Sequence, residues 1–274
     1  MVVDVIHHRP SAILSHVGRV ADRNDRGMAG SRLVGQALAD RLEVPLKVVG
    51  CAEPATSQGW RADLAAAMPG LMQLQAAHLE ALADPYPAIV TLPRCASALA
   101  TLPNVPRLRP DALVVWFDAH PDLNTPASTS TGYLGGMVLS AAVGWWESGL
   151  GGELDSDNIV LGGTRDFDPF ERNLVDDGVI KLAAGPAMLD DLDSYVGDTP
   201  LYFHLDCDVL EPGIVPTEYE ATDGLSLEDL NQVALRLADN EVIGLEIAEM
   251  EAPDDGDSQP VAQLLDALAP LLPG

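Results

Sequence analysis

Two short motifs contain the acidic side chains from which a metal site can be built. Residues 118–122 read Asp-Ala-His-Pro-Asp and follow a hydrophobic run, and residues 206–208 read Asp-Cys-Asp and follow another. In an extended chain, residues two apart point to the same face, so each motif can project its acidic groups together. The candidate metal ligands of these motifs are Asp118, His120, Asp122, Asp206 and Asp208.

Carboxylates gathered in one small region repel one another unless cations neutralise them. Bridging carboxylates together with an imidazole suit Mn²⁺ or a similar ion, and two such ions can activate one shared water. The alternative for either motif alone is a loop in which Asp side chains form caps and turns. Because both motifs close a hydrophobic run, we favour the metal site.

Two further residues near predicted strands require an interpretation. Residues 242–248 lead into Glu249, whose carboxylate is a candidate partner for a cationic substrate group; the alternative is a solvated acid in a loop. His204 lies two residues before Asp206, on the same face of the strand but deeper in the sheet. We expect His204 to be a core histidine with satisfied hydrogen bonds.

Hydrophobic runs and helix-like stretches alternate along the chain. The predicted strands are residues 2–6, 46–51, 88–92, 112–117, 158–162, 179–182, 201–205 and 242–247, and the predicted helices are residues 31–42, 62–82, 134–146, 168–176, 187–195, 226–238 and 260–272. This alternation predicts an α/β fold with a mostly parallel sheet, either a doubly wound three-layer fold or a barrel. In an open parallel sheet, ligands bind at the carboxyl ends of strands, where both acidic motifs lie.

The chain carries no repeat and no Pro/Ser-rich linker that would divide it. We therefore expect a single domain over residues 1–274, with residues 101–110 and 208–224 as loops inside it. Ser226, followed by Glu228 and Asp229, predicts the start of a helix.

The composition argues against several classes of partner. The 274 residues carry 15 Lys and Arg against 42 Asp and Glu, a formal net charge of −27. Such a surface repels nucleic-acid phosphates and anionic lipids, so we expect neither partner. No apolar run approaches the roughly 20 residues of a membrane span, and the N-terminus lacks the pattern of a secretion signal. Three cysteines argue against a disulfide framework, and we expect a cytoplasmic protein.

The motifs are similar to those of the arginase, or ureohydrolase, superfamily, whose members hydrolyse guanidino groups at a dinuclear manganese centre. Residues 118–126 resemble its Asp-Ala-His-x-Asp-x-Asn-x-Pro signature, and residues 206–212 resemble its second metal motif. Residues 244–253 are similar to the segment with its guanidinium-binding glutamate, and residues 165–169 to the segment whose second aspartate holds the substrate α-amino group. The resemblance extends over nearly the whole chain and implies a three-layer fold with an eight-stranded, mostly parallel sheet.

The resemblance also implies roles for single residues. It implies two Mn²⁺ ions, one held by Cys95, Asp118, Asp122 and Asp206 and the other by Asp118, His120, Asp206 and Asp208. The substrate would be a guanidino amino acid. Asn124 and Thr131 would bind its α-carboxylate, Asp168 its α-amino group, and Glu249 would orient its guanidine. A water activated between the ions would attack the guanidino carbon, and Asp122 would carry a proton to the leaving amine. The family also implies a possible homo-oligomer.

Two positions depart from the family pattern. Cys95 stands where a histidine of the family's Gly-Gly-Asp-His loop binds the first metal, and Gly135 stands where arginases carry a proton-relaying histidine. A thiolate ligand would make that ion less Lewis-acidic and shift its preference toward Zn²⁺ or Fe²⁺. The alternative is an unligated Cys95 with a weak or empty first site.

Both departures resemble one branch of the family, the Nω-hydroxy-L-arginine amidinohydrolases of D-cycloserine biosynthesis. The resemblance implies conversion of Nω-hydroxy-L-arginine and water to L-ornithine and hydroxyurea. N-hydroxylation lowers the basicity of the guanidine, which gives a chemical reason for the loss of the relay histidine. The alternatives are an amidinohydrolase for another guanidino compound, of the arginase, agmatinase or guanidinobutyrase type, and a non-catalytic, metal-poor member.

Overall fold

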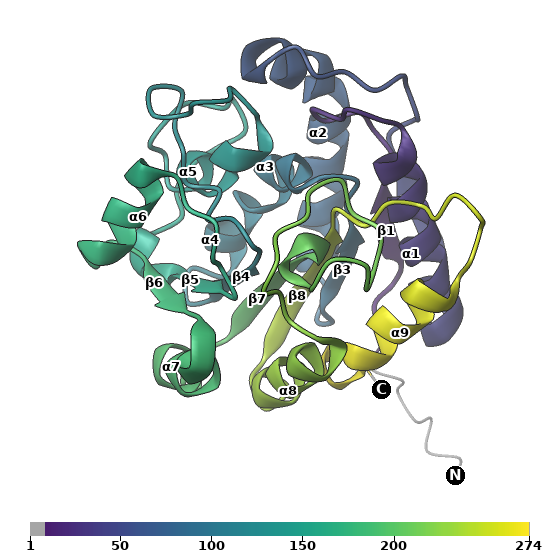
Figure 1. Cartoon of the computed structure of the whole chain (residues 1–274). Coiled ribbons are helices and arrows are strands. Elements are labelled where there is room, and N and C mark those ends of the chain that lie inside the picture. The colour runs from purple at the N-terminus through teal and green to yellow at the C-terminus, as the bar shows by residue number, and fades with distance from the viewer. Residues whose placement is uncertain (1–8, 274) are drawn as a thin grey trace.

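A sheet of eight parallel strands forms the centre of the molecule (Figure 1). The structure is a computed structural model that describes residues 9–273. The strands are β1 (Ile13–His16), β2 (Leu46–Val49), β3 (Ala88–Thr91), β4 (Leu113–Phe117), β5 (Ile159–Gly162), β6 (Lys181–Ala183), β7 (Leu201–Asp206) and β8 (Val242–Ala248). They lie in the order β2-β1-β3-β8-β7-β4-β5-β6, with every neighbouring pair parallel. The predicted α/β fold with an eight-stranded sheet is confirmed, and the sheet is open rather than a barrel.

Helices cover both faces of the sheet and make three layers. They are α1 (Arg26–Leu42), α2 (Trp60–Leu82), α3 (Ala98–Thr101), α4 (Asn104–Leu108), α5 (Val138–Ala142), α6 (Pro169–Asp176), α7 (Met188–Val196), α8 (Leu227–Leu237) and α9 (Gln259–Ala267). One core joins the sheet to α2, α3, α4 and α5, and a second core joins its other face to α1, α7, α8 and α9.

Strand β4 shows why the sequence forms this sandwich. All five of its residues are buried. Because successive side chains alternate between faces, Val114 and Trp116 enter the first core while Val115 and Phe117 enter the second. A strand that is hydrophobic at every position is therefore stable only between two helical layers.

The strand order brings distant segments to one edge of the sheet. β4 pairs with β7, β7 with β8, and β8 with β3, so four strands far apart in sequence are consecutive in space. Phe117 lies opposite Leu205, and Asp206 lies opposite Ala248. The segments that follow these four strands therefore meet at the carboxyl edge.

The structure corrects several predicted elements. Residues 2–6, predicted as the first strand, lie outside the described residues. The first described strand is β1, between β2 and β3, which we missed because Ser15 and His16 interrupt its hydrophobic pattern. Both residues are buried, and His16 Nδ1 lies 2.9 Å from Ser97 Oγ. The helix predicted over residues 134–146 is reduced to α5 after a 3₁₀ turn at Gly135–Met137, and Gly144 ends it with a φ of 78°.

Two other predictions concern loops and helix starts. Residues 101–110 are not a plain loop but contain α4, since Pro is compatible with the first turn of a helix. The predicted start at Ser226 is confirmed: its hydroxyl accepts a 3.1 Å hydrogen bond from the Asp229 N–H, and the Asp229 carboxylate accepts a 3.0 Å bond from the Ser226 N–H. Among residues 9–273, no helix has the length and apolar character needed to cross a bilayer.

Candidate active site

The carboxyl ends of β3, β4, β7 and β8 surround a cavity of about 290 Å³. Nine of the ten candidate metal and substrate residues line it: Cys95, His120, Asp122, Asn124, Thr131, Asp168, Asp206, Asp208 and Glu249. The tenth, Asp118, is only 1% exposed and lies behind the wall in contact with His120. The fold therefore brings together segments that span more than half of the sequence.

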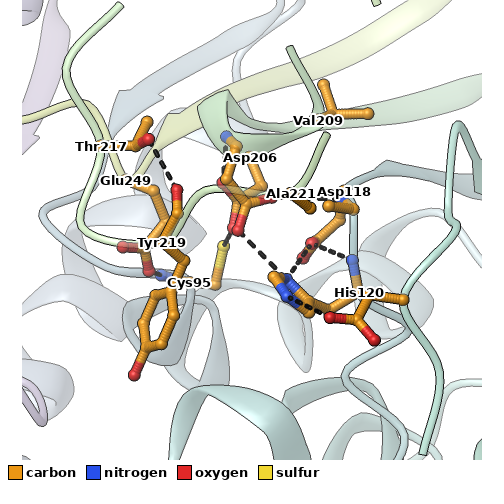
Figure 2. A network of polar contacts seen from close by, with 12 residues as sticks. Cys95, Asp118, His120, Asp206, Val209, Thr217, Tyr219, Ala221 and Glu249 are labelled. Carbon is orange, nitrogen blue, oxygen red and sulfur yellow. Dashed lines mark hydrogen bonds and ion pairs between the residues drawn. The ribbon is translucent and has the colours of Figure 1, made fainter. Parts of the chain in front are cut away.

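One group of side chains comes from the ends of β4 and β7 (Figure 2). His120 Nδ1 lies 3.3 Å from Asp118 Oδ1 and 3.1 Å from Asp208 Oδ2. The loop backbone orients the two carboxylates, because the His120 N–H donates to Asp118 at 2.6 Å and the Ala119 N–H donates to Asp208 at 3.1 Å. One atom from each of the three side chains falls within 4.8 Å of the others, a spacing that a single cation can bridge.

A second group joins the segments after β3, β7 and β8. The Cys95 thiol donates a 2.9 Å hydrogen bond to Asp206 Oδ2, and the Cys95 N–H donates a 2.7 Å bond to Glu249 Oε1. The donor atoms of Cys95, Asp206 and Glu249 again lie within 4.8 Å of one another, as do those of Cys95, Asp118 and Asp122. Cys95 thus lies between the two acidic motifs.

The electrostatics of this cluster favour a bound cation. Burial, and after it the charges of neighbouring carboxylates, raises the pKa of Asp122 and of Asp206 well above the usual value. Burial opposes a charged His120, yet its contacts with Asp118 and Asp208 raise the pKa of this imidazole to about 12. A cluster that must retain protons in the absence of metal gains stability when divalent cations replace those protons.

Two residues of the site have strained backbones. Asp122 has a φ of 52° and Glu249 a φ of 65°, in the left-handed region that non-glycine residues rarely adopt. Both are buried and both line the cavity. Strain of this kind costs about 1–3 kcal/mol and is concentrated at functional sites, where it aims a side chain.

Arg94 is a central residue that the sequence analysis missed. Its side chain is fully buried and contacts four carboxylates: Glu249 at 3.1 Å, Glu251 at 2.8 Å, Glu218 at 2.7 Å and Asp22 at 3.1 Å. The signal available in the sequence was an arginine within the hydrophobic stretch from residue 88 to residue 102. Buried charges are rare unless they are paired, so this arginine had to have acidic partners.

His204 is buried, as expected, and has partners on both ring nitrogens. Nδ1 lies 2.8 Å from Glu246 Oε2, and the ring stacks on Trp116 with centroids 3.5 Å apart. Nε2 lies 3.2 Å from Cys95 Sγ, a contact that we did not expect. His204 therefore lies outside the cavity lining and contacts the cluster through Cys95.

The opposite wall of the cavity carries polar groups suited to a polar head group. Asn124 Nδ2 donates a 2.8 Å hydrogen bond to Asp168 Oδ2. Glu171 holds both loops, because its two carboxylate oxygens accept bonds from the Leu123 N–H at 2.9 Å and the Asp168 N–H at 3.0 Å. Thr131 lies on the same wall and is exposed. Tyr133 and Tyr219, which the sequence analysis did not single out, also line the cavity.

Comparison with known proteins gives consistent matches. The model of the arginase family matches residues 90–269. The chain is 39% identical to the N(omega)-hydroxy-L-arginine amidinohydrolase of Streptomyces lavendulae, over 92% of this chain and 94% of that protein. It is 29% identical to an arginase of Glaciozyma antarctica, over 62% of this chain and 55% of that protein.

Solved structures show the same architecture. The arginase of Bacillus caldovelox superposes with a TM-score of 0.82 at 23% identity, covering 97% of this chain and 98% of that one. Entamoeba histolytica arginase in complex with L-ornithine superposes with a TM-score of 0.80 at 20% identity, covering 95% of this chain and 99% of that one. At these identities the structural likeness concerns the fold alone.

Proposed function

Because the chain belongs to the arginase family and is a hydrolase of C–N bonds in linear amidines, we propose that it converts Nω-hydroxy-L-arginine and water to L-ornithine and hydroxyurea. The observation that carries this choice is the 39% identity, over almost the full length of both chains, with a relative of that name. The match to the arginase of Glaciozyma antarctica covers a smaller share of the chain, 62%, at 29% identity.

The residues present fit a dinuclear metal centre. Buried carboxylates with raised pKa values, a histidine and a thiol supply the donor atoms, which fall into groups within 4.8 Å of one another. We propose that Cys95, Asp118, Asp122 and Asp206 hold one ion and that Asp118, His120, Asp206 and Asp208 hold the other. When bound, two divalent cations lower the pKa of a shared water and so supply the nucleophile for hydrolysis.

The protein's own side chains have two tasks in this reaction. Glu249 orients the guanidine group through charge-assisted hydrogen bonds, so that its carbon faces the acidic cluster. Asp122 is buried beside that cluster and lines the cavity, so its carboxylate is placed to take up a proton and pass it to the departing amine of ornithine.

The polar wall formed by Asn124, Thr131 and Asp168 favours an amino acid as substrate. Asn124 and Thr131 contact the α-carboxylate in our proposal, and Asp168 contacts the α-amino group. We also propose Mn²⁺ as the bound ion, from the carboxylate-rich donor set. The cytoplasm is the proposed compartment, from three cysteines that are free in the structure.

The first experiment is ornithine release by the Mn²⁺-loaded protein, with Nω-hydroxy-L-arginine, L-arginine and agmatine offered in parallel at equal concentration. We expect strong preference for the hydroxylated amino acid. Preference for arginine or agmatine would assign the chain to another amidinohydrolase type. If elemental analysis shows bound metal but the same sample turns over none of these compounds, the result would support a non-catalytic protein.

A further inference from the structure

Tyr133 lines the cavity and carries a buried hydroxyl group without a hydrogen-bond partner among residues 9–273. Leaving such a group unpaired costs about 1–3 kcal/mol. A tyrosine that only filled space would be replaced at no loss by phenylalanine, so the unpaired hydroxyl indicates a bound ligand as its partner.

Gly135 makes room for this ring. A Cβ at position 135 would lie 2.4 Å from Cε1 of Tyr133 and 3.1 Å from its hydroxyl oxygen. The backbone of Gly135 lies outside the left-handed region, so its conformation does not itself require glycine. The absence of a side chain at position 135 is therefore explained by the position of the Tyr133 ring.

Tyr133 lies at the end of the cavity where the guanidine group would bind. After burial, the charge of Glu249 is the strongest influence on the pKa of Tyr133, and both effects raise it. The phenol consequently keeps its proton and can act as a hydrogen-bond donor. The turn Gly135–Met137, which begins two residues after Tyr133, packs against Cys95–Ser97, so Tyr133 lies on the same side as the loop that follows β3.

We propose that Tyr133 determines substrate specificity by donating a hydrogen bond to the oxygen of the substrate's N-hydroxyl group. This inference rests on the proposed function, since it names the residue that would distinguish Nω-hydroxy-L-arginine from arginine. Only the hydroxylated substrate carries an oxygen at that position. With arginine in the site, the phenol stays buried and unpaired, and sites built around a substrate hydroxyl discriminate strongly against analogues that lack it.

Tyr219 is the competing candidate, because its hydroxyl also lacks a partner among residues 9–273. Its ring lies 5.4 Å from that of Tyr133, and the guanidinium of Arg23 lies 4.9 Å from its centroid. Tyr219 is less enclosed than Tyr133, and no glycine within residues 9–273 has the Tyr219 ring among its nearest neighbours. We therefore assign the contact to Tyr133 and use Tyr219→Phe as the comparison.

The test measures kcat/KM for Nω-hydroxy-L-arginine and for L-arginine in the wild type and in Tyr133→Phe. We expect the ratio of the two values to fall roughly 10- to 100-fold in Tyr133→Phe, mainly through loss of the hydroxylated substrate. Tyr195→Phe is the matched control: it removes a phenol from α7, on the opposite face of the sheet, and leaves the ratio unchanged. An unchanged ratio in Tyr133→Phe overturns the proposal, as does a fall confined to Tyr219→Phe.

The products supply a second readout that does not depend on comparing two substrates. Hydroxyurea and urea differ by the same hydroxyl oxygen, so we expect Tyr133→Phe to weaken competitive inhibition by hydroxyurea while inhibition by urea is unaffected. Gly135→Ala displaces the ring and should lower the same preference; retention of full preference would contradict the role of the ring position. If the wild type itself does not hydrolyse Nω-hydroxy-L-arginine, the proposed function fails. If it does and the ratio is insensitive to Tyr133, only the present inference fails.

Discussion

The backbone N–H of Cys95 donates a 2.7 Å hydrogen bond to Oε1 of Glu249, across 154 residues of sequence. The preceding residue, Arg94, contacts the other oxygen of the same carboxylate at 3.1 Å. One short loop after β3 therefore holds both oxygens of Glu249 and also presents a thiol to the acidic cluster. The position of Glu249, the proposed partner of the substrate guanidine, is therefore linked to that of Cys95, the proposed metal ligand.

Replacing Glu249 by glutamine tests its proposed role toward the guanidine group. Glu249→Gln keeps the shape but removes the charge, and we expect kcat/KM to fall about 100-fold or more because charge-assisted hydrogen bonds at the reacting group are lost. Metal content should be preserved. Glu241→Gln, at the exposed far end of the sheet, is the control; a loss below about threefold in Glu249→Gln would rule out the assigned role.

The thiol of Cys95 is expected to contribute to metal binding. Cys95→Ala should lower the bound metal from about two ions per chain toward about one, as measured by elemental analysis after dialysis. Cys207→Ala is the matched control, since Cys207 is equally buried but packs in the core on the other face of the sheet. Equal metal content in both variants would show that Cys95 is not a ligand.

Loss of the buried Arg94 should destabilise the fold. Arg94→Met leaves Asp22, Glu218, Glu249 and Glu251 without their shared cation, which we expect to cost about 3–5 kcal/mol of unfolding free energy in urea titrations. The loss should be smaller at acidic pH, because burial raises the pKa of Asp22 to about 6 and that of Glu249 to about 8, so that protonation relieves the repulsion.

Arg109→Met is the corresponding control on the surface. Arg109 pairs with the exposed carboxylates of Asp111 and Glu241, and such pairs contribute at most about 1 kcal/mol. Equal destabilisation by the two substitutions would contradict the importance assigned to burial.

The stability that two buried histidines contribute should be lost as the pH drops below neutrality, opposing the gain that the raised carboxyl pKa values of the acidic cluster give the metal-free protein. Burial lowers the pKa of His16 and of His78 from 6.5 to about 4. Between those values the unfolded chain binds more protons than the folded one, so the stability that each neutral histidine contributes is complete above pH 6.5 and lost as the pH falls toward 4. The expected loss is about 3 kcal/mol per histidine.

Urea titrations across this pH range measure the effect. His16→Leu removes one of the two groups and should lower the number of protons taken up on unfolding between pH 4 and 6.5 by about one, which is read from the slope of the unfolding free energy against pH. Identical pH dependence in the variant and the wild type would show that His16 does not titrate on unfolding.

Several features of this protein could be predicted from local sequence. Strand β4 is hydrophobic at every position, and β7 and β8 are mostly hydrophobic, a pattern that requires a sheet covered on both faces. The acidic motifs follow β4 and β7, and the rule that ligands bind at the carboxyl ends of parallel strands predicted where their side chains would point. Strand β1 was missed because its polar residues find buried partners that only the fold supplies.

The contacts between these segments were decided by the tertiary structure. The order β3-β8-β7-β4 is not the order of the chain, and it is this order that places Cys95 against Asp206 and Arg94 against Glu249. Local hydrophobic patterns determine which residues are buried, but long-range packing determines which buried groups meet. The sequence therefore did not show that Arg94 pairs with Glu249 or that Gly135 makes room for the Tyr133 ring; the tertiary structure shows both contacts.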